Sequence, residues 1–589
     1  MFPFAKPYKK LLLLIVISNI LISIVDVSLP LFQRYAVDNF IEKGTLDGLP
    51  VFIAAYLAVI ILQVLSFVFY TLSAMKTEMR MGRDLKRACF VHLQTLSFSY
   101  YNTTPVGYIL ARVMSDTNKI AAITAWDLID ILWALSYVSF AFLSMAMLDL
   151  RLALMVMVIV PVIAVLTTYF QKRILFWNRK VRSINSRITG AFNEGIMGAK
   201  TSKTLVIEDK NTHEFSELTE EMRNASVRAA GLNALYIPLV MLASSAATAI
   251  VLARGGNLVL EHGILIGTLS AFTTYAVSIF EPIQQMARVL ANIIAVQPNI
   301  ERVMGLLDQK PNIVDTPEVI EKYGDSFHPK TENWEPIKGD IEFDDVSFRY
   351  PDGEEEVLSH FSLKIPAGTN VAIVGETGAG KSTLVNLACR FFEPTGGRIL
   401  IDGKDYRERS QLWLHSRLGY VLQNPHLFSG TVMDNIRYGR LDATDEEVKQ
   451  AAKAVSADTV VEHLENGYDS DVGEGGDKLS TGEKQLISFA RAVLADPAIF
   501  VLDEATSSID TQTEQLIQNA TMHLLEGRTS FLIAHRLSTI RQADLILVVK
   551  DGKIVEQGKH EELLRKGGYY HDLYSKQFQE EEMSSKLNS

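Results

Sequence analysis

The stretch VAIVGETGAGKST, residues 371–383, decides the fold of the C-terminal half of this 589-residue chain. Four apolar residues of the buried-strand type lead into the pattern G-x-x-x-x-G-K-[ST] at residues 375–382, and a helical pattern begins at Thr383. Glycines allow backbone N–H groups to fold around phosphate oxygens, and the following helix N-terminus adds its dipole. Lys381 can reach the β- and γ-phosphates of a nucleotide, and the Ser382 hydroxyl can ligate Mg²⁺.

A second apolar strand, AIFVL at residues 498–502, ends in two adjacent acids. In a doubly wound sheet an acid at the carboxyl end of such a strand faces the phosphate site. Asp503 is therefore placed to hold Mg²⁺, and Glu504 to polarise the attacking water. Two acids at a strand end are often only solvated, but the upstream phosphate loop makes that alternative improbable here.

The composition separates the chain into two unlike halves. Apolar residues make up 48% of the whole and concentrate in the first half, whereas the second half resembles a soluble α/β protein. The net charge of −11 argues against nucleic acid as a partner. The only cysteines, Cys89 and Cys389, lie one in each half, which excludes a disulfide framework and a cysteine metal cluster.

The first half contains six apolar stretches that are suited to crossing a membrane. A span needs about 20 mostly apolar residues, and a cleaved signal peptide is the alternative for the first stretch, which is too long for it and lacks a convincing cleavage site. The predicted spans are residues 11–32, 51–73, 123–148, 152–170, 235–253 and 264–280.

The two long connections, after spans two and four, carry most of the basic residues of this half. By the positive-inside rule, we expect these connections and both termini to lie on the cytoplasmic side of the cell membrane. Both have a helical composition, and folded as helix pairs they would reach about 30 Å past the bilayer. We therefore expect a six-span domain over 1–310 with long cytoplasmic helical loops, a proline-punctuated linker over 311–338, an α/β phosphate-loop domain over 339–577 and a polar tail over 578–589.

Phosphate loop, strand-end acids and six preceding spans together resemble the ATP-binding cassette (ABC) superfamily, specifically its half-size exporters. The resemblance covers nearly the whole chain and implies ATP and Mg²⁺ as ligands. It also implies a second half-transporter as partner, because only one phosphate loop and no internal repeat are present. A heterodimer is the favoured assembly, and a homodimer is the alternative. Residues 375–382 and Asp503-Glu504 carry this resemblance.

Further motifs match those of the family in order and spacing. Tyr350 matches the aromatic platform for adenine, and Gln423 matches the glutamine that senses the γ-phosphate, Mg²⁺ and the membrane domain. Asp510 matches the loop that contacts the partner cassette, and His535 the switch histidine that bonds the γ-phosphate. The resemblance thus implies Glu504, His535 and Gln423 as catalytic residues and Ser382, Gln423 and Asp503 as Mg²⁺ ligands. It implies nucleotide contacts from Tyr350, Gly375, Glu376, Thr377, Gly378, Ala379, Gly380, Lys381, Ser382, Thr383, Ser480, Gly482 and Asp510.

The signature position reads LSTGE at residues 479–483, where the family usually has L-S-G-G-Q. Ser480 and Gly482 are kept. Thr481 places a side chain where glycine allows close approach to the partner's ATP, and Glu483 replaces an amide with an anion. One interpretation is that these two changes are sequence drift that the ATP site tolerates. The other is that this signature motif serves a weakened ATP site. Segments near 101–107 and 198–203 occupy the positions of the coupling helices.

Three acids lie within the predicted spans. Asp26 is in span one, and Asp127 and Asp130 are near the inner end of span three. Such acids are costly in lipid unless they face a cavity or a partner, so a cation pathway and structural pairing both stay open. We expect ATP-driven export of an amphiphilic small molecule, with membrane lipid around the protein. Lipid or peptide translocation and a non-pumping, ATP-regulated membrane protein are the alternatives.

Overall fold

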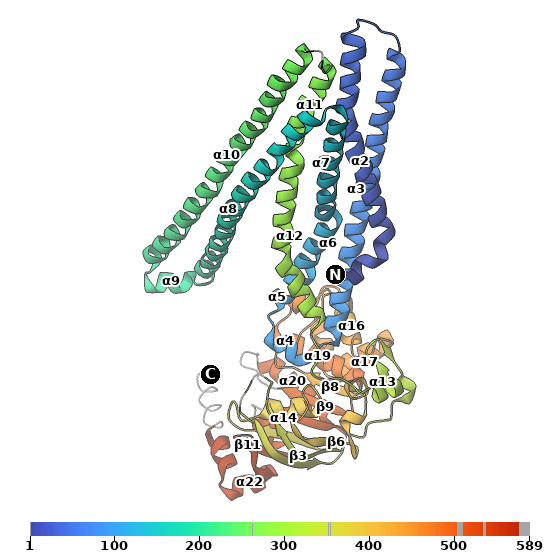
Figure 1. The fold of residues 1–589 in the computed structure, drawn as a ribbon. Coiled ribbons are helices and arrows are strands. Elements are labelled where there is room, and N and C mark those ends of the chain that lie inside the picture. The colour runs from blue at the N-terminus through green and yellow to red at the C-terminus, as the bar shows by residue number, and fades with distance from the viewer. Residues whose placement is uncertain are drawn as a thin grey trace. The chain divides into compact units, whose positions relative to one another are not determined.

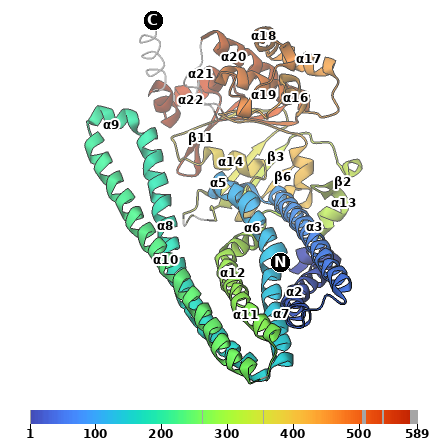
Figure 2. The same cartoon turned by 90° about the horizontal axis from the view of Figure 1, so that it is seen from above.

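The structure, a computed structural model, describes residues 2–261, 263–351, 353, 355–503, 511–533 and 537–576. The chain divides into two compact units, which are drawn together in Figures 1 and 2 and are described separately below. The helical unit comprises Met1–Gln94 and Thr104–Gln309, and the α/β unit comprises Thr95–Thr103 and Lys310–Ser589.

The helical unit is built from long apolar helices. Five helical stretches are long and apolar enough to cross a membrane, counted over the described residues: Pro3–Ile41, Leu49–Thr95, Val106–Leu148, Leu150–Met197 and Glu208–Leu260. The elements of this unit are α1 (Phe2–Ala5), η1 (Lys6–Tyr8), α2 (Lys9–Ala36), η2 (Val37–Ile41), α3 (Leu49–Thr95), α5 (Val106–Leu110), η3 (Ala111–Asp116), α6 (Thr117–Ala122), η4 (Ile123–Asp127), α7 (Leu128–Leu148), α8 (Leu150–Met197), α9 (Ala199–Leu205), α10 (Glu208–Leu260), α11 (Ile266–Ser278) and α12 (Phe280–Leu307).

The sixth predicted span, residues 264–280, falls on α11, which has 13 residues and is shorter than the about 20 that a span needs. Ile279 separates α11 from α12, which begins with Phe280 and Glu281. The apolar stretch therefore ends at a helix break, and the chain continues as a more polar helix.

The helices α3, α8 and α10 extend far beyond their apolar stretches. They contain 47, 48 and 53 residues, which at 1.5 Å per residue is about 70–80 Å, against a hydrocarbon core of about 30 Å. Figure 1 shows α8 and α10 as a long antiparallel pair joined by α9. The long connection between spans four and five is thus a continuation of the two spanning helices.

The core of the helical unit lies where α2, α7, α8, α10 and α11 meet. Phe272 and Tyr275 of α11 are fully buried there, with Met145 of α7 and Val251 of α10. The Tyr275 hydroxyl donates a hydrogen bond to the Val27 carbonyl of α2 (2.5 Å). This bond satisfies the buried hydroxyl and holds α11 against α2.

The α/β unit has two larger sheets and a set of helices. Figure 2 shows α16–α20 gathered at one end of this unit and β3 and β6 at the other. Its elements are α4 (Phe98–Thr103), α13 (Pro317–Tyr323), β1 (Gly324–Asp325), β2 (His328–Pro329), η5 (Thr331–Asn333), β3 (Ile341–Phe348), β4 (Leu358–Ile365), β5 (Asn370–Val374), α14 (Lys381–Ala388), β6 (Gly396–Ile401), β7 (Lys404–Asp405), η6 (Tyr406–Glu408), α15 (Gln411–His415), β8 (Leu418–Val421), α16 (Val432–Arg437), α17 (Asp445–Ala454), α18 (Asp458–Glu462), η7 (Gly467–Asp469), η8 (Glu474–Gly476), α19 (Thr481–Ala495), β9 (Ile499–Asp503), α20 (Thr511–Leu525), β10 (Thr529–Ile533), α21 (Leu537–Arg541), β11 (Leu545–Lys550), β12 (Lys553–Gly558) and α22 (His560–Lys566).

The six-stranded sheet has the order β12-β11-β5-β10-β9-β8, and all of its neighbours pair in parallel except β11 and β12. The second sheet, β4-β3-β6-β7, is antiparallel. Leu384 of α14 packs in one core with Phe343 of β3 and Val371 of β5, so α14 joins the two sheets. The predicted class, a helical membrane domain followed by an α/β phosphate-loop domain, is confirmed.

Candidate functional site

The phosphate loop lies between β5 and α14, in the setting that its sequence predicts. Gly378 and Gly380 adopt φ values of +87° and +101°, which residues with a Cβ rarely adopt. A Cβ built on Gly378 would meet no atom within 4 Å, so this side of the loop is open to a ligand. The loop therefore has the backbone shape and the free space that a chain of phosphates requires.

Lys381 is held against this loop by its own backbone. Its ammonium donates hydrogen bonds to the carbonyls of Gly375 (2.7 Å) and Glu376 (2.9 Å), and the residue is only 8% exposed. Burial lowers the pKa of the Lys381 ammonium, and the Asp503 carboxylate opposes that shift. A phosphate in the loop would offer this buried cation the negative charge that two neutral carbonyls cannot supply.

Parallel pairing brings the remaining described site residues to the same edge of the sheet. Asp503, the last residue of β9, is in register with Ile533 of β10, which in turn is in register with Ile373 of β5. Gln423 follows two residues after the end of β8, the neighbour of β9. The carboxyl ends of parallel strands form one edge, so Gln423, Asp503 and the phosphate loop all follow strands at this edge. Glu504, Asp510 and His535 lie outside the described residues.

The predicted Mg²⁺ ligands have the donor chemistry that this ion requires. Ser382 supplies a hydroxyl, Gln423 an amide oxygen and Asp503 a carboxylate, and Mg²⁺ is a hard cation that prefers oxygen ligands. All three follow the carboxyl ends of strands in one sheet or begin the helix after it. The residues present therefore fit Mg²⁺ bound together with a nucleotide.

Tyr350, shortly after β3, lies beside the start of α14. Its hydroxyl is 2.9 Å from Oγ1 of Thr383, and its ring makes edge-to-face contacts with Phe348 (4.9 Å between centroids) and Phe392 (5.2 Å). The hydrogen bond and the two rings fix a half-buried aromatic ring next to the phosphate loop. Phe392 was not among the predicted site residues, because a phenylalanine after a helix carries no signal of its own in the sequence.

The altered signature segment begins helix α19. Ser480 is the N-cap: its hydroxyl accepts from the Glu483 N–H (3.3 Å), and the Glu483 carboxylate accepts from the Ser480 N–H (2.7 Å). This is a reciprocal capping box, and an anion in the first turn also suits the helix dipole. Thr481 is exposed and Gly482 is buried. The acid at position 483 thus has a local structural role in its own helix.

An aromatic contact within the α/β unit was also missed by sequence reasoning. Phe98, the first residue of α4, stacks on Phe391 with centroids 5.3 Å apart. Ser97 and Ser99 accept hydrogen bonds from the backbone and side chain of Asn312 (3.1 and 2.8 Å). Residues 97–99, just before the predicted coupling position 101–107, are therefore held within the α/β unit.

The three acids in the spans have different surroundings. Asp130 accepts a hydrogen bond from Gln285 of α12, and Asp127 accepts one from Asn292 of α12 (3.4 Å). Asp26 accepts from Gln63 of α3 and Trp133 of α7. The pair on span three thus bridges to a neighbouring helix, whereas Asp26 also lines a cavity.

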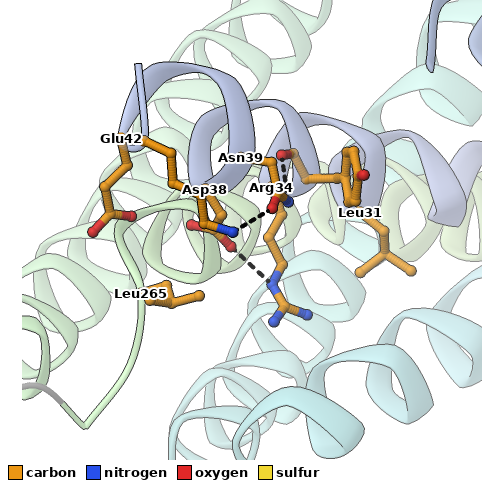
Figure 3. Close-up of a pocket in the computed structure, with 8 residues that line it drawn as sticks. Leu31, Arg34, Asp38, Asn39, Glu42 and Leu265 are labelled. Carbon is orange, nitrogen blue, oxygen red and sulfur yellow. Dashed lines mark hydrogen bonds and ion pairs between the residues drawn. The ribbon is translucent and has the colours of Figure 1, made fainter. Parts of the chain in front are cut away.

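A further acid, Asp38 of η2, lines a cavity together with Arg34 and Asn39 (Figure 3). It is 6% exposed, accepts from the Gly267 N–H at the start of α11 (2.7 Å) and forms an ion pair with Arg34 (3.4 Å). Asn39 accepts a hydrogen bond from Lys43 (2.7 Å) at the same cavity, which measures about 400 Å³. Because these charges and amides pair with one another, we interpret this cavity as a structural junction between α2 and α11.

Comparison with known proteins gives the family. Residues 12–283 match the ABC transporter transmembrane region, and residues 358–507 match the ABC transporter family. The chain is 36% identical over 577 residues to the Bacillus subtilis ABC transporter ATP-binding protein YfiC, covering 97% of this chain and 92% of that protein. It is 36% identical over 550 residues to the ATP-dependent lipid A-core flippase of Desulfotalea psychrophila, covering 92% and 94%.

Two further likenesses agree with this assignment. A probable multidrug resistance ABC transporter of Bacillus subtilis, YheH, is 37% identical over 505 residues, covering 85% of this chain and 72% of that protein. The solved structure of a bacterial Atm1-family ABC exporter with ATP bound matches with a TM-score of 0.78 at 27% identity, covering 97% of this chain and 98% of that one. The chain belongs to the ABC transporter family, as a membrane-spanning, ATP-binding and ATP-hydrolysing exporter.

Proposed function

We propose that this chain is one half of a dimeric exporter that uses ATP to move an amphiphilic small molecule out of the cell across the cytoplasmic membrane. The observation that carries the proposal is the open phosphate loop with its buried Lys381, in one chain with five apolar helical stretches. ABC exporters act as dimers, and their chemistry requires two cassettes. We assign 1–310 to the membrane domain, 311–338 to the linker and 339–577 to the cassette.

The proposed roles follow from chemistry at the sheet edge. Lys381 binds the β- and γ-phosphates, and Tyr350 provides the aromatic surface beside the loop that suits an adenine ring. Glu504 orients and polarises the attacking water, and His535 bonds the γ-phosphate. Ser382, Gln423 and Asp503 would hold Mg²⁺, which when bound offsets charge on the phosphate oxygens. ATP binding then favours one arrangement of the membrane domains, and hydrolysis restores the other.

The proposed orientation places both termini and the cassette in the cytoplasm, and it requires residues 264–280 to make a sixth crossing besides the five long stretches. It is supported by the basic residues in the connections after spans two and four, among them Lys76, Arg80, Lys172 and Arg173. Loops rich in lysine and arginine near the ends of membrane spans lie on the cytoplasmic side. The helical extensions of α3, α8 and α10 would then lie on the side of the ATPase.

We further propose that the working unit is a heterodimer in which this chain supplies the intact hydrolytic residues. Each ATP site of an ABC dimer joins the phosphate loop of one chain to the signature of the other. Lys381, Asp503, Glu504 and His535 are all present, while the signature carries Thr481 and Glu483. Pairing with a partner that lacks the catalytic glutamate would confine the altered signature to one slow site.

Two experiments test these proposals. Inside-out vesicles that contain the transporter are supplied with ATP and a panel of dyes, lipids and peptides, and ATP-dependent uptake of amphiphilic dyes supports the export of small molecules. Uptake of lipid alone would support the second candidate, which the 36% identity to a lipid A-core flippase favours. Transport is then compared for this chain alone and for the chain together with a neighbouring half-transporter; robust transport by the chain alone would contradict the heterodimer.

A further inference from the structure

Asp26 lies inside α2, a helix whose apolar stretch is long enough to span a membrane. It lines a cavity of about 490 Å³ to which α2, α3, α7 and α11 contribute residues. An acid on a membrane helix is costly unless it faces a cavity or a partner, and such acids often mark a substrate path. Besides Asp26, its lining residues include Phe32, Phe52 and Tyr56.

The hydrogen bonds of Asp26 come from neutral groups. The Gln63 amide donates to Oδ1 (2.6 Å), and the Trp133 indole N–H, which can only donate, donates to Oδ2 (3.2 Å). Both carboxyl oxygens of Asp26 therefore accept hydrogen bonds. Among the residues that the structure describes, no lysine, arginine or histidine forms an ion pair with Asp26, and the cavity is lined by none of these cations.

Asp38, on the helical turn that continues α2, provides the contrast. It is paired with Arg34, and Asp116 of the same unit is likewise paired with Arg302 (2.8 Å). These acids carry their own counterions. Asp26 has no such counterion within the described part of the chain, and the Glu281 carboxylate adds further negative potential to its surroundings. The negative potential in the cavity thus favours the binding of a cation that is not part of the chain.

Aromatic rings also line the cavity. Phe32 lies 5.9 Å from Phe52 and 5.7 Å from Tyr56, and the rings of Phe52 and Tyr56 are stacked with 13° between their planes and centroids 6.2 Å apart. The faces of aromatic rings attract cations, and their area suits an apolar ligand. A single carboxylate with such a wall is a poor site for a metal ion, which needs several oxygen ligands.

We propose that Asp26 is the counterion in a binding subsite for amphiphilic organic cations, in which the charge lies at Asp26 and the apolar groups pack on Phe32, Phe52 and Tyr56. The proposal rests on the proposed export function and adds a substrate class to it. In the proposed orientation, Phe52 and Tyr56 at the start of α3 place the subsite in the outer half of the membrane.

Equilibrium binding of two probes tests this subsite in the assembled transporter, purified in uncharged maltoside micelles. Radiolabelled tetraphenylphosphonium and tetraphenylborate are measured in separate samples, because they share size and shape but have opposite charge. We expect the cation to bind and the anion not to bind. Asp26→Asn, which keeps the volume and removes the charge, should weaken cation binding about tenfold or more.

Matched variants keep the result interpretable. Asp26→Glu should retain the affinity for the cation to within about threefold, since the charge remains. Asp47 is an exposed acid in the connection between η2 and α3, and the Asp47→Asn variant should bind the cation as the wild type does. Tyr56→Leu should weaken binding about threefold or more while the carboxylate stays in place, and it tests the site should Asp26→Asn fail to fold. Equal binding of the two probes, no binding of the cation, or unchanged binding in Asp26→Asn or in Tyr56→Leu would overturn the proposal.

Because probe binding needs no ATP, binding and transport measurements test the cation subsite and the proposed export function separately. Wild-type transporter that takes up a neutral amphiphile or a lipid with ATP, yet binds no tetraphenylphosphonium, would overturn the cation subsite and leave export standing. Binding that depends on Asp26, in a protein that transports nothing with ATP, would establish the subsite and overturn export.

Discussion

Lys381 illustrates how one residue links the backbone of the phosphate loop to its chemistry. Its ammonium donates hydrogen bonds to the carbonyls of Gly375 and Glu376, and the residue is almost fully buried. These contacts to the backbone of the loop restrict the side chain, which reduces the side-chain entropy lost on binding a phosphate.

Replacement of Lys381 by alanine should weaken ATP binding at least about tenfold, because the variant removes a buried, charge-assisted contact to the phosphates. Binding of a fluorescent ATP analogue to the purified transporter measures this loss. Lys553→Ala, an exposed lysine on β12, is the control and should bind as the wild type does. A Lys381→Ala variant with unchanged affinity would remove the residue from the nucleotide site.

Tyr350 should influence ATP affinity more than the maximal rate. Tyr350→Ala removes the ring and should raise the ATP concentration for half-maximal hydrolysis several-fold, while the maximal rate changes little, because stacking on the base acts equally in the ground and transition states. Tyr350→Phe loses only the hydrogen bond to Thr383 and should stay close to the wild type. If Tyr350→Phe were as impaired as Tyr350→Ala, the hydroxyl and not the ring would be the functional group.

Among the elements, the junction between α2 and α11 depends on a glycine. The start of α11 approaches Asp38 so closely that a Cβ on Gly267 would collide with the Arg34 carbonyl and the Asp38 carboxylate. Gly267→Ala should therefore destabilise the helical unit by about 1–3 kcal/mol, as overpacking typically does.

The midpoint of thermal unfolding in micelles measures this effect. Gly256→Ala, on α10, is the matched control, since a Cβ there would meet no atom within 4 Å. Equal midpoints for the two variants would show that α2 and α11 are not held as tightly as this contact implies.

The helices also show where sequence patterns stop being informative. The predicted spans end where the composition turns polar, but the backbone hydrogen bonds of a helix continue regardless, so α10 runs on from Glu208 to Leu260 around a predicted span of 235–253. Conversely, the break at Ile279 has a local cause, because Pro282 has no N–H with which to continue the backbone hydrogen bonds from the Ser278 carbonyl. The end of α11 thus carries a signal in the sequence, whereas the extensions of α10 do not.

For the whole molecule, local motifs could be predicted and distant contacts could not. The strand, loop and helix around residues 371–388 follow from adjacent residues, and the structure has β5 and α14 in these positions. The partners of Asp26 are 37 and 107 residues away along the chain, so Gln63 and Trp133 gave no signal of their role. The sequence therefore identifies the ATP-binding domain, whereas the contacts of the acids in the spans can be known only from the three-dimensional structure.

The most direct test of ATP-driven export is ATP-dependent uptake into inside-out vesicles by the assembled transporter, with and without the change Glu504→Gln. This variant keeps the shape of the side chain but cannot polarise water as a carboxylate does, so hydrolysis and uptake should both fall at least about 100-fold while ATP binding persists. Uptake of an amphiphile that requires hydrolysable ATP and is lost in Glu504→Gln is the predicted result. Steady ATP hydrolysis by the wild type without ATP-dependent uptake of any dye, lipid or peptide in the panel would contradict the account.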